Sequence, residues 1–107
     1  MKYMMFVCTD QEPDEDRTDD IDGWVASVEG RRLDGSPLAA PSMATTVRVR
    51  DGETLITDGP FVETKEFIGG FDILDCADLD EAIDIARAHP MARIGRLELR
   101  PIVDFDD

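Results

Sequence analysis

The stretch Lys2-Tyr3-Met4-Met5-Phe6-Val7-Cys8, residues 2–8, decides the fold class of this 107-residue chain. Its side chains alternate between two sets that are both apolar: Tyr3, Met5 and Val7 on one face, and Met4, Phe6 and Cys8 on the other. A strand with two apolar faces is typical of the centre of a sheet that is covered on both sides. The stretch therefore predicts a central, doubly covered strand.

Further strands are predicted downstream of this one. Residues 67–75 again place apolar side chains on both faces, and the pair Gly69-Gly70 inside them predicts a bulge or a close backbone approach. Residues 44–50 alternate regularly, and Asp51-Gly52 is a strong hairpin signal before a returning strand at 55–57. A last strand is expected from Arg96 to Ile102.

Two helices are expected between these strands. The first runs from about Thr18 to Leu33 with Trp24 on its core face, and residues 34–37 read as a turn after it. The second begins after Asp78, an N-cap that forms a capping box with Glu81. The apolar stripe of this second helix consists of Leu79, Ala82, Ile83 and Ala86.

The order strand, helix, hairpin, strand, helix, strand predicts an α+β fold. It is a ferredoxin-like, split β-α-β subunit with an added hairpin strand, in a single domain over residues 1–107. Right-handed crossovers place both helices on one face of the sheet, which leaves the second apolar face uncovered. Because burying such side chains stabilises by about 1.5–3 kcal/mol each, we expect a homodimer with face-to-face sheets and a cleft near the interface.

The composition excludes several classes of function. Only 11 Lys and Arg residues oppose 25 Asp and Glu residues, and the net charge of −14 argues against binding to nucleic acid or to an anionic membrane. No apolar run approaches the roughly 20 residues of a membrane-spanning helix. The N-terminal apolar stretch is too short for a signal peptide, so a cytoplasmic protein is expected.

The candidate metal ligands and nucleophiles are few. Cys8 and Cys76 are far apart in the sequence and are expected to be buried thiols, and His89 stands at the predicted end of the second helix. The acidic residues 10–22 lack the spacing and the glycine of a calcium loop. With no zinc motif and no glycine-rich phosphate loop, we predict neither a metal nor a cofactor.

Residues 57–70, Thr-Asp-Gly-Pro-Phe-Val-Glu-Thr-Lys-Glu-Phe-Ile-Gly-Gly, carry a family signature. They resemble the DGPF-type branch of the YCII-related family, and the resemblance extends over nearly the whole chain. It includes the opening Met1-Lys2-Tyr3-Met4, the segment 44–48 before the signature, and Glu98-Leu99-Arg100-Pro101 near the end.

The resemblance implies a dimeric α/β-barrel built from ferredoxin-like subunits, without an established activity for this branch. It also implies a regulatory setting, because members are often partners or genomic neighbours of extracytoplasmic-function sigma factors. The shorter branch uses a His/Asp pair, and some of its members act on small ring compounds, for example in dehydrochlorination. His89 matches no position of that pair.

The signature allows two interpretations, and both stay open. In the first it is scaffold: Asp58 bonds its own turn, Gly59 adopts unusual dihedrals, and Phe61 fills the core. In the second it contributes to a ligand site in the dimer cleft. The expected catalytic residues are Asp58 or Glu66 as proton acceptor and Lys65 as electrophilic stabiliser, and the expected ligand-binding residues are Arg48, Glu63 and Arg100.

Two classes of function follow for such a site. One is a homodimeric module that binds a small polar or anionic ligand, or that regulates a sigma-factor circuit through protein contact. The alternative is a cofactor-independent enzyme, an isomerase or lyase that uses acid–base chemistry at the dimer interface. A purely structural interaction protein is the third possibility.

Overall fold

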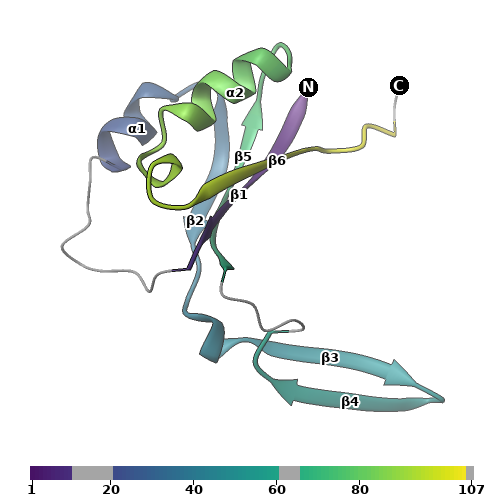
Figure 1. Cartoon of the computed structure of the whole chain (residues 1–107). Coiled ribbons are helices and arrows are strands. Elements are labelled where there is room, and N and C mark those ends of the chain that lie inside the picture. Colours follow the sequence, from purple (N-terminus) through teal and green to yellow (C-terminus); the bar gives the residue numbers. More distant parts are fainter. Residues whose placement is uncertain (11–20, 61–65, 106–107) are drawn as a thin grey trace.

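The computed structural model of the chain describes residues 1–10, 21–60 and 66–105 (Figure 1). Two short 3-10 turns, Pro41–Met43 and Pro90–Ala92, supplement the helices and strands. The helices and strands are, in chain order, β1 (Lys2–Thr9), α1 (Ile21–Ser27), β2 (Arg32–Pro37), β3 (Thr45–Arg50), β4 (Glu53–Asp58), β5 (Phe67–Asp75), α2 (Leu79–Arg87) and β6 (Arg96–Pro101).

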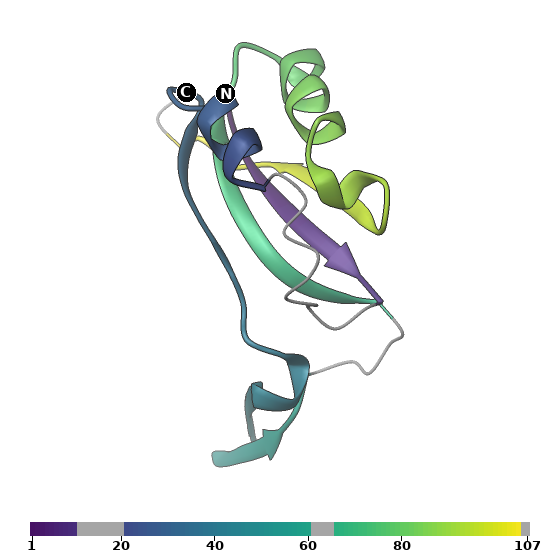
Figure 2. The ribbon, with the colours of Figure 1, turned by 90° about the vertical axis from the view of Figure 1, so that its left-hand side faces the viewer.

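Four strands form an antiparallel sheet in the order β2-β5-β1-β6. This is the strand order of a split β-α-β unit, with β1 and β5 in the centre as predicted. Both helices lie on the same face of the sheet (Figures 1 and 2). The expected bulge is confirmed, because Val7 is paired with Gly70 and Cys8 with Ile68, so that Gly69 is the extra residue.

The prediction for residues 28–37 was wrong. Instead of continuing to Leu33, α1 ends at Ser27, and the residues read as a turn belong to the edge strand β2. Gly30 has φ +92°, which ends the helical path, and the Asp75 N–H then donates to the Arg31 carbonyl at 2.7 Å. The expected start of this helix near Thr18 lies outside the described residues.

The hairpin is confirmed, but its place in the fold differs from the expectation. Asp51 and Gly52 both have positive φ, 52° and 78°, as a two-residue hairpin turn of this type requires. However, β3 and β4 form a separate two-stranded sheet that extends away from the main sheet (Figure 1). The hairpin is thus an insertion between β2 and β5, and the second strand of the split β-α-β unit is β2.

The core lies between the sheet and the two helices. Trp24 is buried there as predicted, and its indole N–H donates to the Ile85 carbonyl at 2.9 Å. Both cysteines are buried free thiols, also as predicted, and Cys76 belongs to this core whereas Cys8 lies on the other face of the sheet. The other members of this core are Tyr3, Met5, Val28, Leu74, Ala82 and Ala86.

The second helix begins as the sequence indicates. The Asp78 carboxylate accepts a hydrogen bond from the Glu81 N–H at 2.9 Å, while the Glu81 carboxylate accepts one from the Ala77 N–H. The predicted apolar stripe is only half right, because Leu79 and Ile83 are exposed and Ile85 packs against the core in their place. None of the described helices combines the length and the apolar character of a membrane span.

Candidate functional site

The face of the main sheet that is turned away from α1 and α2 carries apolar side chains. Cross-strand pairing places Met4 beside Ile73 and Phe6 beside Phe71 on this face, which we call the open face. These four side chains are only partly buried, whereas Tyr3, Met5 and Leu74 on the helix-covered face are almost fully buried. The two central strands therefore have two apolar faces, and the helices cover one of them.

Strand β6 borders the open face with a row of charged residues. Pairing with β1 places Arg96 beside Cys8, Glu98 beside Phe6 and Arg100 beside Met4. The Arg100 guanidinium carbon lies 5.9 Å from the centre of the Phe6 ring, within the range of a cation–π contact. Arg100 Nη2 also lies 3.5 Å from Glu98 Oε2. A guanidinium beside an aromatic surface suits a flat, anionic molecule.

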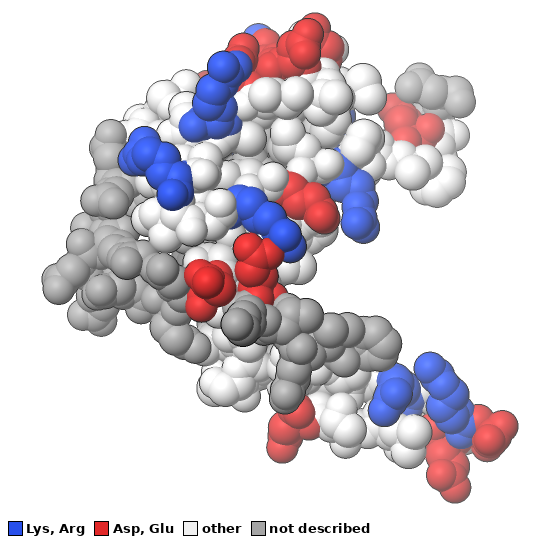
Figure 3. Space-filling model, viewed as in Figure 1, with Lys and Arg blue, Asp and Glu red and all other residues white. Residues whose placement is uncertain are grey.

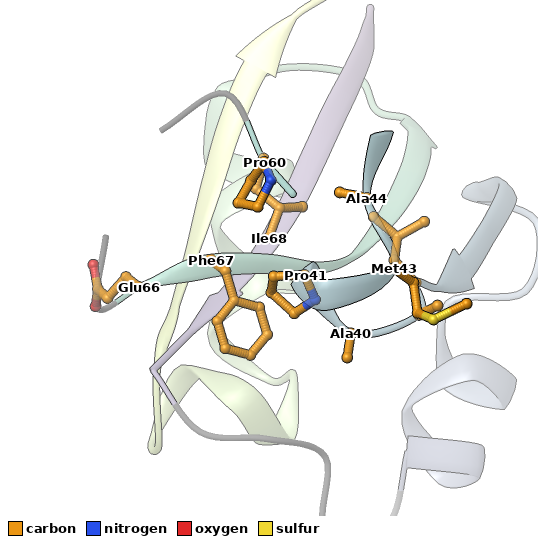
Figure 4. A pocket seen from close by; sticks show the side chains of 10 residues that line it. Ala40, Pro41, Met43, Ala44, Pro60, Glu66, Phe67 and Ile68 are labelled. Atoms are coloured by element: carbon orange, nitrogen blue, oxygen red, sulfur yellow. The ribbon is translucent and has the colours of Figure 1, made fainter. Parts of the chain in front are cut away.

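A hollow of about 470 Å³ lies where the hairpin joins the sheet (Figure 4). Its wall is mainly apolar, and Glu66 is the charged residue in it. Ile68 belongs both to this wall and to the open face, because it is paired with Cys8. The hollow thus continues the open face toward the hairpin. The full lining is Leu38, Ala39, Ala40, Pro41, Met43, Ala44, Pro60, Glu66, Phe67 and Ile68.

The predicted site residues fall into two groups. Arg100 and Glu66 lie on the body of the molecule, where Glu66 Oε2 forms an ion pair with Arg96 Nη1 at 2.6 Å. Arg48 and Asp58 lie on the hairpin, and both are exposed. Glu63 and Lys65 lie outside the described residues, as does Phe61.

Two members of the charged row were not among the predicted site residues. Arg96 and Glu98 alternate with Leu97 and Leu99 along β6, so they share a face with Arg100. This period-two spacing was a sufficient signal to include them. Gly59 has the unusual dihedral that the scaffold interpretation expects of it, because its φ of +100° is one that glycine tolerates best.

His89 has a structural role on the helix side of the molecule. It is 3% exposed, lies edge-on to Trp24 with ring centres 4.5 Å apart, and accepts a hydrogen bond from the Met91 N–H at Nδ1. Burial lowers the pKa of His89 from 6.5 to about 4, so the ring is neutral at pH 7. His89 therefore packs on the helix-covered side of the sheet and does not belong to the open face.

Asp72 and Arg32 join β5 to the edge strand β2. Arg32 Nε donates to Asp72 Oδ1 at 2.7 Å, and the carboxylate is buried on the helix-covered face beside Met5. Burial raises the pKa of Asp72 more than the neighbouring Arg32 lowers it. Gly35 lies against this pair, where a β-carbon would overlap the side chains of Asp72 and Arg32. The glycine that suggested a turn is thus required by a close contact within a sheet.

Burial raises the pKa of the Cys76 thiol, which is the third described group with a displaced pKa. Like Asp72 and His89 it belongs to the covered side of the sheet. Among the described residues, no three His, Cys, Asp or Glu side chains gather as a metal site would require. The described open face offers two guanidinium groups, a neighbouring carboxylate and aromatic rings as its chemical groups.

This α+β fold, with two helices on one face of an antiparallel sheet, has known relatives. The YCII-related domain matches residues 1–106, and the chain therefore belongs to the YCII-related family. An uncharacterized protein of Rhizobium meliloti (strain 1021), R00369, is 48% identical over 69 residues. The alignment covers 61% of this chain and 54% of that protein, so it spans about half the length of the relative.

A solved structure shares the fold over almost its whole length. The 5-chloro-2-hydroxyhydroquinone dehydrochlorinase TftG from Burkholderia phenoliruptrix AC1100, in complex with 2,5-dihydroxybenzoquinone, superposes with a TM-score of 0.59. The match covers 99% of this chain and 97% of that one, at 12% sequence identity. At this identity the likeness concerns the fold alone.

Proposed function

We propose that the chain is a homodimeric module that binds a small anionic ring compound between two open faces. The contact of Arg100 with Phe6, at 5.9 Å on a partly buried face, is the observation that carries the proposal. An arginine held over an aromatic ring offers a positive charge and a flat surface together. A second copy on this face would exclude water and strengthen both interactions.

The chemical class of the ligand follows from the groups on this face. Phe6 and Phe71 are paired across β1 and β5 and give an apolar floor, while Arg96 and Arg100 bring positive charge to a chain whose net charge is −14. A planar anion matches both features. The complex of TftG with 2,5-dihydroxybenzoquinone is an example of a small ring compound bound by a protein of this fold.

Binding is favoured over catalysis by the position of the displaced pKa values. Displaced pKa values tend to cluster at catalytic sites, whereas Asp72, Cys76 and His89 lie on the helix-covered side. The alternative function, a cofactor-independent isomerase or lyase, is supported by the reaction named for TftG. In that function Asp58 or Glu66 accepts a proton and Lys65 stabilises negative charge.

A regulatory role would connect ligand binding to a protein partner. Membership of the DGPF branch, proposed from the signature at residues 57–70, suggests a sigma factor as this partner. The net charge of −14 favours a protein contact over direct binding to DNA. Co-purification of the tagged chain from cells, with recovery of a sigma factor as the expected result and its absence as the contradicting one, tests this part separately.

Calorimetric titration with 2,5-dihydroxybenzoquinone, the probe of choice, tests the proposed site. Arg100→Leu is expected to weaken binding tenfold or more, about 1.4 kcal/mol, because it removes the charge over Phe6. Arg87→Leu on α2 is the matched control and should leave the affinity unchanged. Equal affinity in Arg100→Leu, or no binding of the probe at millimolar concentration, contradicts the proposal. Release of chloride from 5-chloro-2-hydroxyhydroquinone, with the organic product followed by NMR, would select the enzymatic alternative.

A further inference from the structure

The hairpin formed by β3 and β4, residues 45–58, extends from the body as an arm with an apolar face. Cross-strand pairing places Val47 beside Ile56, and Val49 lies on the same face of the arm. The exposed fractions of these three side chains are 60%, 65% and 58%. A contiguous exposed apolar surface of this kind marks an interaction site.

The arm lacks the support that a hairpin normally needs. A two-stranded hairpin is at best marginally stable alone in water, and it needs a third strand or a packed surface. Among the described residues, the strands of the arm are hydrogen-bonded to each other and to no other strand. The missing surface must therefore be provided from outside the described part of the chain.

The chain as a whole is more extended than a compact domain of its length. The radius of gyration is 15.9 Å, whereas a compact domain of this length has about 13 Å. The accessible surface is 7848 Å², roughly 1,900 Å² above the value expected for a compact monomer of 11.9 kDa. Stable interfaces bury about 800 Å² per partner, and obligate ones about 1,000–2,500 Å². The excess matches what an obligate dimer would cover.

The arm extends on the same side of the sheet as the open face. Figures 1 and 2 show the arm extending on the side of the sheet opposite to α1 and α2. The segment after β6 extends on the same side at the other end of the sheet, with Val103 68% and Phe105 92% exposed. In the space-filling view the molecule is deeply hollowed between these two projections (Figure 3). The arm thus bounds the space that a second subunit on the open face would fill.

The arginines of the arm lie on the face opposite to Val47, Val49 and Ile56, because cross-strand pairing places Arg48 beside Leu55 and Arg50 beside Glu53. Arg48 and Arg50 form no ion pair with any residue in the described ranges, although Arg50 donates to the Val49 carbonyl. When the apolar face of the arm packs on a second copy, these two guanidinium groups stay on the outer side, so the apolar contact alone carries the interaction.

We infer that the arm is a dimerisation clasp: the face formed by Val47, Val49 and Ile56 packs on a second copy of this chain seated on the open face. This inference rests on the proposed dimer and adds the element that holds it together. Two-fold symmetry makes the contact reciprocal, so that each subunit gives one arm and receives one.

Sedimentation equilibrium of the full-length chain tests the clasp with a double substitution, Val47→Asp and Ile56→Asp. The dimer dissociation constant should rise at least 100-fold, because two charges replace the apolar contact. Ile83→Asp is the matched control, because Ile83 is 43% exposed on α2, away from the open face. The dimer dissociation constant of this variant should change less than threefold. Near-UV circular dichroism of Trp24 checks that the body of each variant is folded.

The possible outcomes separate the clasp from the dimer itself. If the arm variant dimerises as tightly as the unmodified chain while Phe71→Asp on the open face is monomeric, the clasp is wrong and the proposed dimer stands. If the unmodified chain is a monomer at every concentration, both are wrong. Amide exchange gives a second readout, since residues 45–58 should be protected in the dimer and should lose protection on dilution.

Discussion

The body of the molecule and the hairpin arm use similar strands in opposite environments. In the body, Tyr3 and Met5 of β1 are 2% and 0% exposed, because two helices pack on that face of the sheet. On the arm, Val47 and Val49 of β3 have a comparable apolar spacing and are mostly exposed. An alternating strand predicts that one of its faces is buried, but the pattern does not specify which surface covers that face. The comparison teaches that the burial encoded in the arm needs a surface beyond the described chain.

The largest difference between body and arm is expected in the free energy of unfolding, when a leucine is replaced by alanine in each of them. Leu74→Ala in β5 should lower the free energy of unfolding by about 2–5 kcal/mol, because it opens a cavity in a fully buried position. Leu55→Ala on the arm should change it by about 0.5 kcal/mol or less in separated subunits. Urea denaturation at protein concentrations below the dimer dissociation constant measures both. Similar losses for the two variants would remove the distinction between body and arm.

Acid titration gives a smaller effect that belongs to the body alone. The pKa of His89 is about 4 in the folded chain and 6.5 in the unfolded one, so the unfolded state binds more protons between these values. Stability is complete above pH 6.5 and falls by about 2–3 kcal/mol as the pH drops toward 4. His89→Gln should flatten this part of the profile, measured as urea midpoints from pH 7 to pH 4. An unchanged slope in the variant would show that His89 is not the group that titrates.

The smallest effect concerns the ends and turns of single elements. Asp78→Ala removes the side-chain cap of α2 and should lower the unfolding free energy of the body by about 1 kcal/mol. Gly52→Ala strains the turn of the arm, where φ is +78°, and should leave the thermal transition of the body unchanged in subunits diluted below the dimer dissociation constant. Thermal denaturation followed by Trp24 fluorescence compares the two variants. A larger loss in Gly52→Ala would mean that the arm and the body unfold as one unit.

Local sequence patterns predicted most of the body. The doubly apolar strands β1 and β5, the bulge at Gly69 and the capped start of α2 each depend on neighbouring residues, so the sequence alone sufficed. The edge strand β2 was missed because Arg-Leu-Asp-Gly-Ser-Pro contains turn residues. Its conformation is imposed by pairing with β5, by the Asp72–Arg32 ion pair and by the lack of a side chain at Gly35. These contacts are long-range, so local propensity did not reveal them.

The candidate site was predicted only in part, for a related reason. Arg100 was identified from the sequence, and the alternation along β6 could also have yielded Arg96 and Glu98. Arg48 and Asp58 were expected beside these residues, but they lie on the arm, and sequence spacing does not specify which sheet a hairpin joins. Whether Arg48 and Arg100 contribute to one cleft depends on the assembly, which local patterns do not encode.

The molar mass of the unmodified chain in solution tests the central claim most directly. Light scattering at micromolar concentration should give twice the 11.9 kDa of one chain, because in the proposed dimer a second copy covers the open face and both arms hold it. A mass of 11.9 kDa that persists up to high concentration would contradict the account, since the apolar face and the arm would then be exposed to water.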